Sequence, residues 1–243
     1  MSARQLAFST LRAIYHKGAF ADVALDRTLR KHALSSADRR LLTELVYGMV
    51  RRRRTLDALI DQLAKKKAHQ QHPDIRIMLH IGLYQLRYLD HIPDSAAVHS
   101  TVELVKQSKL GRLKGFVNSL LRQYLRLSAS GTWHFASDAP PLSVTQIGIQ
   151  HSYPDWIVQV WSEQIGLAET EALCEYLNQP PPLDLRVNTL KTSPEALKKA
   201  LHAAGYATQP KTPAPQAVRV TGATGPVRSL PGFDEGQWVV QDS

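Results

Sequence analysis

Apolar residues in the first half of the chain recur with the spacing of helices. In two stretches, pairs of apolar residues are separated by two further positions, so that they line one side of a helix. Residues 75–89 are apolar on nearly every side, as expected of a central helix that others surround. Ser35, three residues before Asp38, is typical of a helix start. The two stripes consist of Leu41, Leu42, Leu45, Val46, Met49 and Val50, and of Phe116, Val117, Leu120, Leu121, Tyr124 and Leu125.

Shorter patterns complete this helical region. Two helices precede the first stripe, one around Leu11 and one around Leu25, and another follows Pro93 with Val98 and Val102 on its inner side. Together these patterns predict an all-α bundle of about seven helices over residues 1–128.

The pattern changes after residue 128. Residues 129–145 are rich in turn-forming residues and have no helical period, so we interpret them as a linker. The fold is therefore expected to be mainly α, with a small α/β subdomain over residues 146–243. Its predicted elements are helices at 156–165 and 169–178, a strand at 183–190, a helix at 194–204 and a strand at 217–221.

The last eight residues, 236–243, have the pattern of an approach to a further strand. Nothing after them could close a sheet around that strand. We therefore expect the α/β subdomain to be incomplete and the chain to be truncated before a following domain.

Composition places the chain among ordinary globular proteins. Its 243 residues correspond to one or two domains, and 43% hydrophobic with 21% charged residues excludes a disordered chain or a collagen-like one. The one cysteine, Cys174, cannot form an internal disulfide. There is no apolar run of about 18 to 20 residues and no signal peptide, so a cytoplasmic protein without a membrane partner is expected.

Charge is divided unevenly along the chain. Residues 1–130 contain 23 Lys and Arg against 10 Asp and Glu, a net +13, whereas residues 131–243 contain 7 against 11, a net −4. Such an asymmetry indicates that the first part faces a polyanion, and nucleic acid is the leading candidate.

The most concentrated charge is a run of four arginines that follows the first apolar stripe. A run at a helix end could be a solvated cap, since cations are favoured there, but four adjacent like charges repel one another more than capping requires. We therefore predict phosphate contacts, which position a nucleic acid without reading its bases. The candidate RNA-binding residues are Arg39, Arg40, Arg51, Arg52, Arg53, Arg54, Lys109, Arg112, Lys114 and Arg122.

Three other motifs were considered as metal, cofactor or catalytic sites. His69 and His72 lack Cys, Asp or Glu partners at ligand spacing, so no metal site is predicted. The glycine turn at 222–225 is followed by Pro226 and an irregular stretch and not by a helix that could receive a phosphate. Cys174 lies on an amphipathic helix, where a thiol is usually a small core residue. No catalytic, cofactor-binding or metal-ligating residue is therefore assigned.

One ordered set of motifs is distributed over residues 1–128. It comprises Ala3 to Tyr15, Asp38-Arg39-Arg40-Leu41 with Leu45-Val46-Tyr47-Gly48, Ile75-Arg76-Ile77-Met78-Leu79 with Tyr84-Gln85-Leu86, Ile92-Pro93, Val98 with Val102-Glu103-Leu104-Val105-Lys106, and Phe116-Val117-Asn118-Ser119-Leu120-Leu121-Arg122. In order and spacing this set resembles the NusB-like RNA-binding helical domain.

A second set follows. It comprises Ser152-Tyr153-Pro154-Asp155-Trp156, Asn178-Gln179-Pro180-Pro181-Pro182-Leu183, Leu185-Arg186-Val187-Asn188-Thr189, and Gly232-Phe233-Asp234-Glu235-Gly236 with Val239-Val240-Gln241-Asp242-Ser243. It resembles the RRM-like segment that follows a NusB-like domain in the small-subunit rRNA (cytosine-C5) methyltransferases.

The resemblance implies a fold and a function. Members of this family bind S-adenosylmethionine in a Rossmann-like domain that begins directly after the Gln-Asp-Ser segment, and they use two cysteines in catalysis. Neither the glycine-rich cofactor loop nor those cysteines occur here, and Cys174 matches neither cysteine's context. The resemblance thus implies the RNA-binding, substrate-positioning part of a 16S rRNA methyltransferase. This chain would have small-subunit rRNA as its partner, would bind no cofactor itself and would be inactive alone.

Two alternatives remain open. One is a stand-alone NusB-like factor that joins RNA and protein partners in transcription antitermination, although such a factor needs only the helical bundle. The other is a DNA-binding helical protein, since phosphate contacts do not distinguish nucleic acids. The target nucleotide and the oligomeric state are not specified by the sequence.

Overall fold

The computed structural model describes residues 1–130, 143–210, 214–222 and 227–241. It divides into two compact units, Met1–Tyr176 and Leu177–Ser243. Within the described residues, no helix is both long and apolar enough to cross a membrane.

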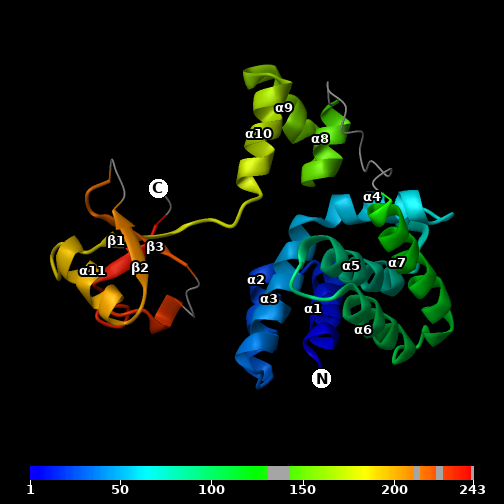
Figure 1. Cartoon of the computed structure of the whole chain (residues 1–243), viewed down its shortest axis with the longest axis horizontal. Coiled ribbons are helices and arrows are strands. Elements are labelled where there is room, and N and C mark those ends of the chain that lie inside the picture. Colours follow the sequence, from blue (N-terminus) through cyan, green and yellow to red (C-terminus); the bar gives the residue numbers. More distant parts are fainter. Residues whose placement is uncertain (131–142, 211–213, 223–226, 242–243) are drawn as a thin grey trace. The chain divides into compact units, whose positions relative to one another are not determined.

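The first unit contains the predicted seven-helix bundle, which confirms the fold expected for this part of the chain. Its helix α5 lies in the middle and packs against α1, α3, α4, α6 and α7 (Figure 1). The nine consecutive residues from Ile77 to Gln85 are buried, as is Ile75, because the helix is covered on nearly every side. The helices are α1 (Ala3–Lys17), α2 (Ala21–Lys31), α3 (Ser36–Arg51), α4 (Arg53–Leu63), α5 (Pro73–Tyr88), α6 (Asp94–Lys106) and α7 (Lys114–Ala129).

Local signals in the sequence explain where these helices begin and how closely they pack. The Ser35 hydroxyl accepts a hydrogen bond from the backbone N–H of Asp38 at 3.1 Å, which caps α3 as predicted. Gly48 on α3 lies against Tyr84 of α5, and a Cβ at position 48 would overlap the Tyr84 hydroxyl and ring. The Tyr84 hydroxyl also donates to Glu44 Oε1 of α3 at 2.6 Å, so this side chain holds α5 close to α3 by packing and by a hydrogen bond.

Three further helices complete the first unit: α8 (Val144–His151), α9 (Asp155–Ile165) and α10 (Leu167–Leu177). A small cluster joins one buried residue from each, Ile147, Val158 and Cys174. Helix α8 begins inside the linker predicted over 129–145, because Ser143 and Gln146 form a capping box there. The remainder of that predicted linker, 131–142, lies outside the described residues.

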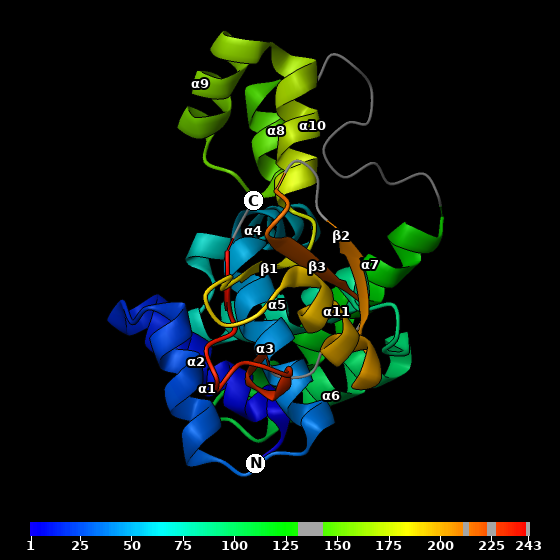
Figure 2. The same cartoon turned by 90° about the vertical axis from the view of Figure 1, so that its left-hand side faces the viewer.

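The second unit is a four-stranded antiparallel sheet with one helix. The strands β1 (Leu183–Val187), β2 (Ala207–Pro210), β3 (Ala217–Thr221) and β4 (Trp238–Val240) lie in the order β2-β3-β1-β4. Helix α11 (Pro194–Ala203) lies beside β2 and β3 (Figure 2). Its residues Leu197 and Leu201 belong to one buried cluster with Leu185, Val218 and Trp238 of the sheet. This confirms the small α/β subdomain.

Three details of this unit differ from the sequence-based prediction. The first strand ends at Val187 and not at Leu190, since Asn188 starts a turn that its side chain stabilises through the Leu190 N–H. Strand β2 was not predicted. The strand expected from Gly236 onward does form, and it already has a partner, because β4 pairs with β1.

The division between units also lies elsewhere than the predicted boundary at residue 145. Helices α8 and α9, and α10 as far as Tyr176, belong with the bundle. The contacts responsible involve α4, where the Thr55 hydroxyl donates to the Ile149 carbonyl at 2.7 Å.

Candidate nucleic-acid interface

The four-arginine run lies at the junction of two helices. Arg51 is the last residue of α3, Arg52 has the non-helical angles φ −97° and ψ 14°, and Arg53 is the first residue of α4. The run is therefore interrupted at Arg52, between the two helices. Arg51 and Arg53 are exposed, whereas Arg52 and Arg54 are half-buried.

Arg54 is engaged in contacts within the chain. Its guanidinium donates to the carbonyl of Tyr153 and pairs with Asp155 Oδ1 at 2.5 Å. Its backbone N–H donates to the Ser152 hydroxyl at 3.0 Å. A Cβ at Gly148 would lie only 2.5 Å from Arg54 Nη1, so the guanidinium fills a space that only glycine leaves. We call these contacts the Arg54 clasp; they hold α8 and α9 against α4.

Two other members of the run lie on tyrosine rings. The guanidinium carbon of Arg53 is 4.5 Å from the ring centroid of Tyr15, and that of Arg52 is 5.1 Å from the ring centroid of Tyr88. Burial raises the pKa of Tyr15, against the opposing effect of the Arg53 charge. Stacking occupies one face of each guanidinium and leaves its edge N–H groups able to donate.

Beneath the run lies a charged network between α4 and α5. Asp57 accepts from Arg76 Nε at 2.6 Å and contacts His80 Nε2 at 2.9 Å. Burial alone would raise the pKa of Asp57, but the hydrogen bonds from His80 and Arg76 lower it to about 2. Burial lowers the pKa of His80, which is fully enclosed, so the neutral ring donates to the carboxylate. This network is closed to solvent on the histidine side and serves packing.

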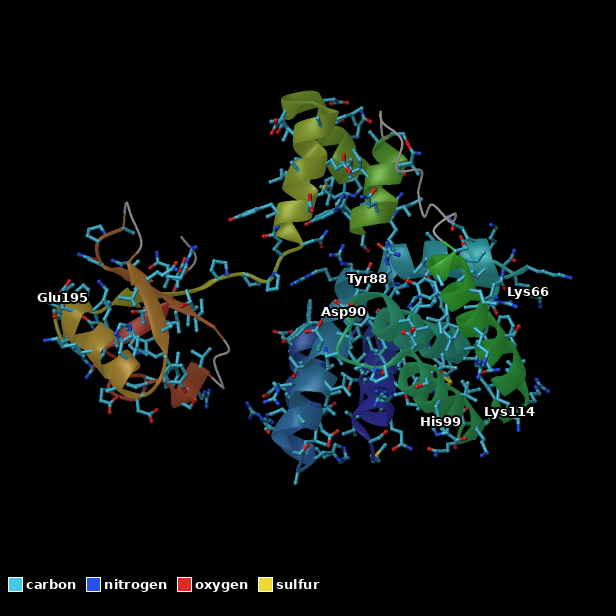
Figure 3. All side chains as sticks on the ribbon, viewed as in Figure 1. Lys66, Tyr88, Asp90, His99, Lys114 and Glu195 are labelled. Carbon is cyan, nitrogen blue, oxygen red and sulfur yellow. The ribbon has the colours of Figure 1, made fainter. Side chains whose placement is uncertain are left out.

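The remaining candidate residues form two groups. Arg39 and Arg40 are exposed in the first turns of α3, beside Asp38. Three of the others lie where α6 turns into α7 through the short helix η2 (Gly111–Leu113), and Arg122 lies in the middle of α7; Figure 3 labels Lys114 at the start of α7. All four members of this second group, Lys109, Arg112, Lys114 and Arg122, are exposed.

One residue of the second group was missed from the sequence. Arg126 is exposed on α7, one turn beyond Arg122. The signal that could have revealed it is the absence of acidic residues: from Glu103 to Asp138 the sequence contains six Lys and Arg and neither Asp nor Glu.

Among the residues that the structure describes, no element offers a binding site for S-adenosylmethionine. Strand β3 ends at Thr221, and the next described element is the three-residue helix η3 (Val227–Ser229), too short to offer a phosphate-binding or cofactor-binding helix start. The Cys174 thiol is buried, and burial raises its pKa, which disfavours the thiolate. Among the described residues there is no group of three His, Cys, Asp or Glu that could hold a metal ion.

Comparisons with known proteins agree with this architecture. Residues 1–126 match the model of the NusB family, and residues 153–228 match the ferredoxin-like domain described as Methyltr_RsmF/B-like. The chain is similar to a probable ribosomal RNA small subunit methyltransferase B of Synechocystis, with 48% identity over all 243 residues and 53% of that protein. It is 30% identical to the corresponding probable enzyme of Bacillus subtilis over 99% of this chain and 52% of that protein.

A solved structure shares the fold. The crystal structure of PH0851 superposes with a TM-score of 0.64 and 16% identity, covering 99% of this chain and 53% of that one. The chain spans about half the length of the curated relatives it matches.

Proposed function

Because the chain belongs to the NusB family, we propose that it is the RNA-binding, substrate-positioning part of a methyltransferase that modifies cytosine C5 in 16S rRNA with S-adenosylmethionine as the methyl donor. One observation carries the proposal: a single chain combines a basic NusB-like bundle with a ferredoxin-like unit, and relatives similar over its full length are named small-subunit rRNA methyltransferases.

The division of labour follows from the residues present. Methylation at C5 requires a thiolate to add to the ring, so that C5 becomes nucleophilic toward the methyl donor. Cys174 is buried on α10 and cannot approach a base. This chain would therefore bind and orient the RNA through lysine and arginine contacts to phosphates, and would neither hold the methyl donor nor transfer the methyl group alone.

The alternative of a stand-alone antitermination factor accounts for less of the chain. A NusB-like bundle is sufficient for it, whereas residues 153–228 match a domain described for methyltransferases. Binding experiments can distinguish the proposal from an antitermination factor and from a DNA-binding protein.

The test is to measure the affinity of the full chain for structured small-subunit rRNA fragments and for duplex DNA of equal length at the same salt concentration. Both affinities must be measured at the same salt concentration, because binding to phosphates releases counterions and the affinity therefore depends on salt. Tighter binding to the rRNA fragments supports the proposal. Equal or tighter binding to duplex DNA contradicts it.

A second measurement addresses catalysis. Calorimetry of the chain with S-adenosylmethionine should show no binding, and labelled methyl transfer to rRNA should stay at background. Micromolar binding or turnover would show that the residues described here do form a cofactor site.

A further inference from the structure

The second basic group lies in the turn before α7 and on α7 itself, and it differs from the arginine run in what surrounds it. Arg122 and Arg126 lie one turn apart on the helix, and Gly115 and Ser119 are exposed on the same side. The opposite side is buried in the bundle, through Val117, Leu120, Leu121 and Tyr124. We call the exposed side, with the turn that precedes it, the α7 basic face; it comprises Lys109, Arg112, Lys114, Arg122 and Arg126.

The charge of this face is not neutralised by its neighbours in sequence. Helix α7 contains no acidic residue, and the last acid before it, Glu103, pairs with Lys106 at 3.2 Å, outside the face. The arginine run, in contrast, shares its helices with Asp38, Glu44, Asp57 and Asp61. Along its own helix, therefore, no carboxylate offsets the charge of the face.

The donors of the face are also mostly uncommitted to other parts of the fold. The guanidinium of Arg122 donates only locally, from Nε to Asn118 Oδ1 at 3.2 Å one turn away. Arg54 instead gives two donors to the clasp, whereas Arg52 and Arg53 each have one guanidinium face on a tyrosine ring and keep their edge N–H groups able to donate. Exposed cations that are held only by their own helix are the ones a phosphate can recruit at little structural cost.

The chemistry of the face indicates how it would bind. Between Gly48 and Asp155, no described large hydrophobic residue is exposed, so the face offers no aromatic ring for a base to stack on and no apolar anchor for a membrane. Arg122 and Arg126 are about 6 Å apart along the helix axis, at 1.5 Å per residue, and share one side of it, so both can face the same stretch of nucleic-acid backbone.

From these observations we propose that the α7 basic face, and not the four-arginine run, is the main surface on which the RNA backbone lies, and that it binds phosphates without reading bases. This inference rests on the proposed function, since it assumes that the chain binds RNA. It assigns Arg54 to the clasp and not to the RNA.

The experiment compares two variants of equal charge in the full chain. The face variant carries Lys114→Gln, Arg122→Gln and Arg126→Gln. The matched control carries Arg27→Gln, Arg30→Gln and Lys31→Gln, three exposed cations on α2, which also contains Asp22 and Asp26. Glutamine has a helix propensity close to that of lysine and arginine, so circular dichroism should show both variants folded.

Binding is measured by fluorescence anisotropy at several salt concentrations with two probes, a structured small-subunit rRNA fragment and poly(U). Each phosphate contact contributes about 0.7 to 0.9 to the slope of log affinity against log salt concentration. The face variant should therefore lower the slope by about 2, by the same amount for both probes, while the control keeps the wild-type slope.

The outcomes separate the two proposals. If the wild-type chain binds neither probe at low salt, the proposed function fails. If it binds and the face variant behaves as the control does, RNA binding stands and the α7 basic face is wrong. If the face variant weakens binding to the rRNA fragment alone, the face reads sequence or structure, and the backbone-only assignment is overturned.

Discussion

Substitution of Arg54 by alanine tests whether the clasp holds α8–α10 to the bundle. The change removes a charged hydrogen bond to the Tyr153 carbonyl and an ion pair with Asp155, while the backbone contact to Ser152 and the Thr55 hydroxyl contact remain. A hydrogen bond from a charged donor contributes about 1.5 to 3 kcal/mol. The ion pair adds less than about 1 kcal/mol, because its side chains are 28% and 51% exposed.

We therefore expect α8–α10 to lose about 2 to 3 kcal/mol of local stability. Since 1.4 kcal/mol is a factor of ten in an equilibrium constant, amide hydrogen exchange in peptides from 144–176 should accelerate by about 30-fold or more. Peptides from α5, at the centre of the bundle, should exchange at the wild-type rate. Hydrogen exchange followed by mass spectrometry measures both regions in one sample.

Arg51→Ala is the matched control, because it removes an exposed arginine from the same run. It should leave exchange in 144–176 unchanged. Wild-type exchange there in Arg54→Ala, or equal acceleration in both variants, would refute the clasp. RNA affinity should fall little in Arg54→Ala, provided that the bundle stays folded, because the guanidinium is not assigned to a phosphate.

Three further predictions concern the core. Gly48→Ala should lower the free energy of unfolding, measured by urea denaturation, by about 1 to 3 kcal/mol, since the new methyl group overlaps Tyr84. Adding Tyr84→Leu should recover part of this loss. An unchanged stability in Gly48→Ala would contradict the packing described. The free energy of unfolding should fall as pH is lowered through about 6.5, because burial lowers the pKa of His80 and only the unfolded chain then binds a proton there. It should fall again below about 4, because Asp57 becomes protonated in the unfolded chain while its pKa in the folded protein is about 2. His80→Gln should weaken the dependence between pH 7 and 5, and an unchanged dependence would assign it to other histidines. Cys174 should react with a thiol reagent only slowly until denaturant is added, whereas fast labelling of the native chain would show that α10 does not bury it.

The sequence predicted the bundle well because its helices are long and their apolar positions keep a strict period. In α3, four of the six stripe residues, Leu42, Leu45, Val46 and Met49, are buried, and the other two pack against the core. Helix α8 lacked such a signal, since it has eight residues and a glycine at its centre, and its stability depends on contacts with α4 that lie about a hundred residues away in sequence.

The candidate site was less predictable for the same reason. The four arginines from Arg51 to Arg54 cannot be distinguished in the sequence, but a helix break at Arg52 and contacts with distant residues give them different environments. No local pattern could reveal that Asp155 and the Tyr153 carbonyl would engage Arg54. The exposed side of α7, by comparison, follows from its own helical period, so Arg126 was available to a charge-window analysis.

The contact between Gly48 and Tyr84 implies a rule for how this bundle can diverge. With a tyrosine on α5, any residue other than glycine at position 48 overlaps its ring and destabilises the protein, so we expect position 48 to vary after position 84 has become smaller. The two positions should therefore covary among relatives, with tyrosine at 84 always accompanied by glycine at 48. Evolution would therefore begin with a smaller residue at position 84, which leaves a cavity and keeps the helices in place. A larger residue at position 48 would come second, because on its own it would clash with Tyr84.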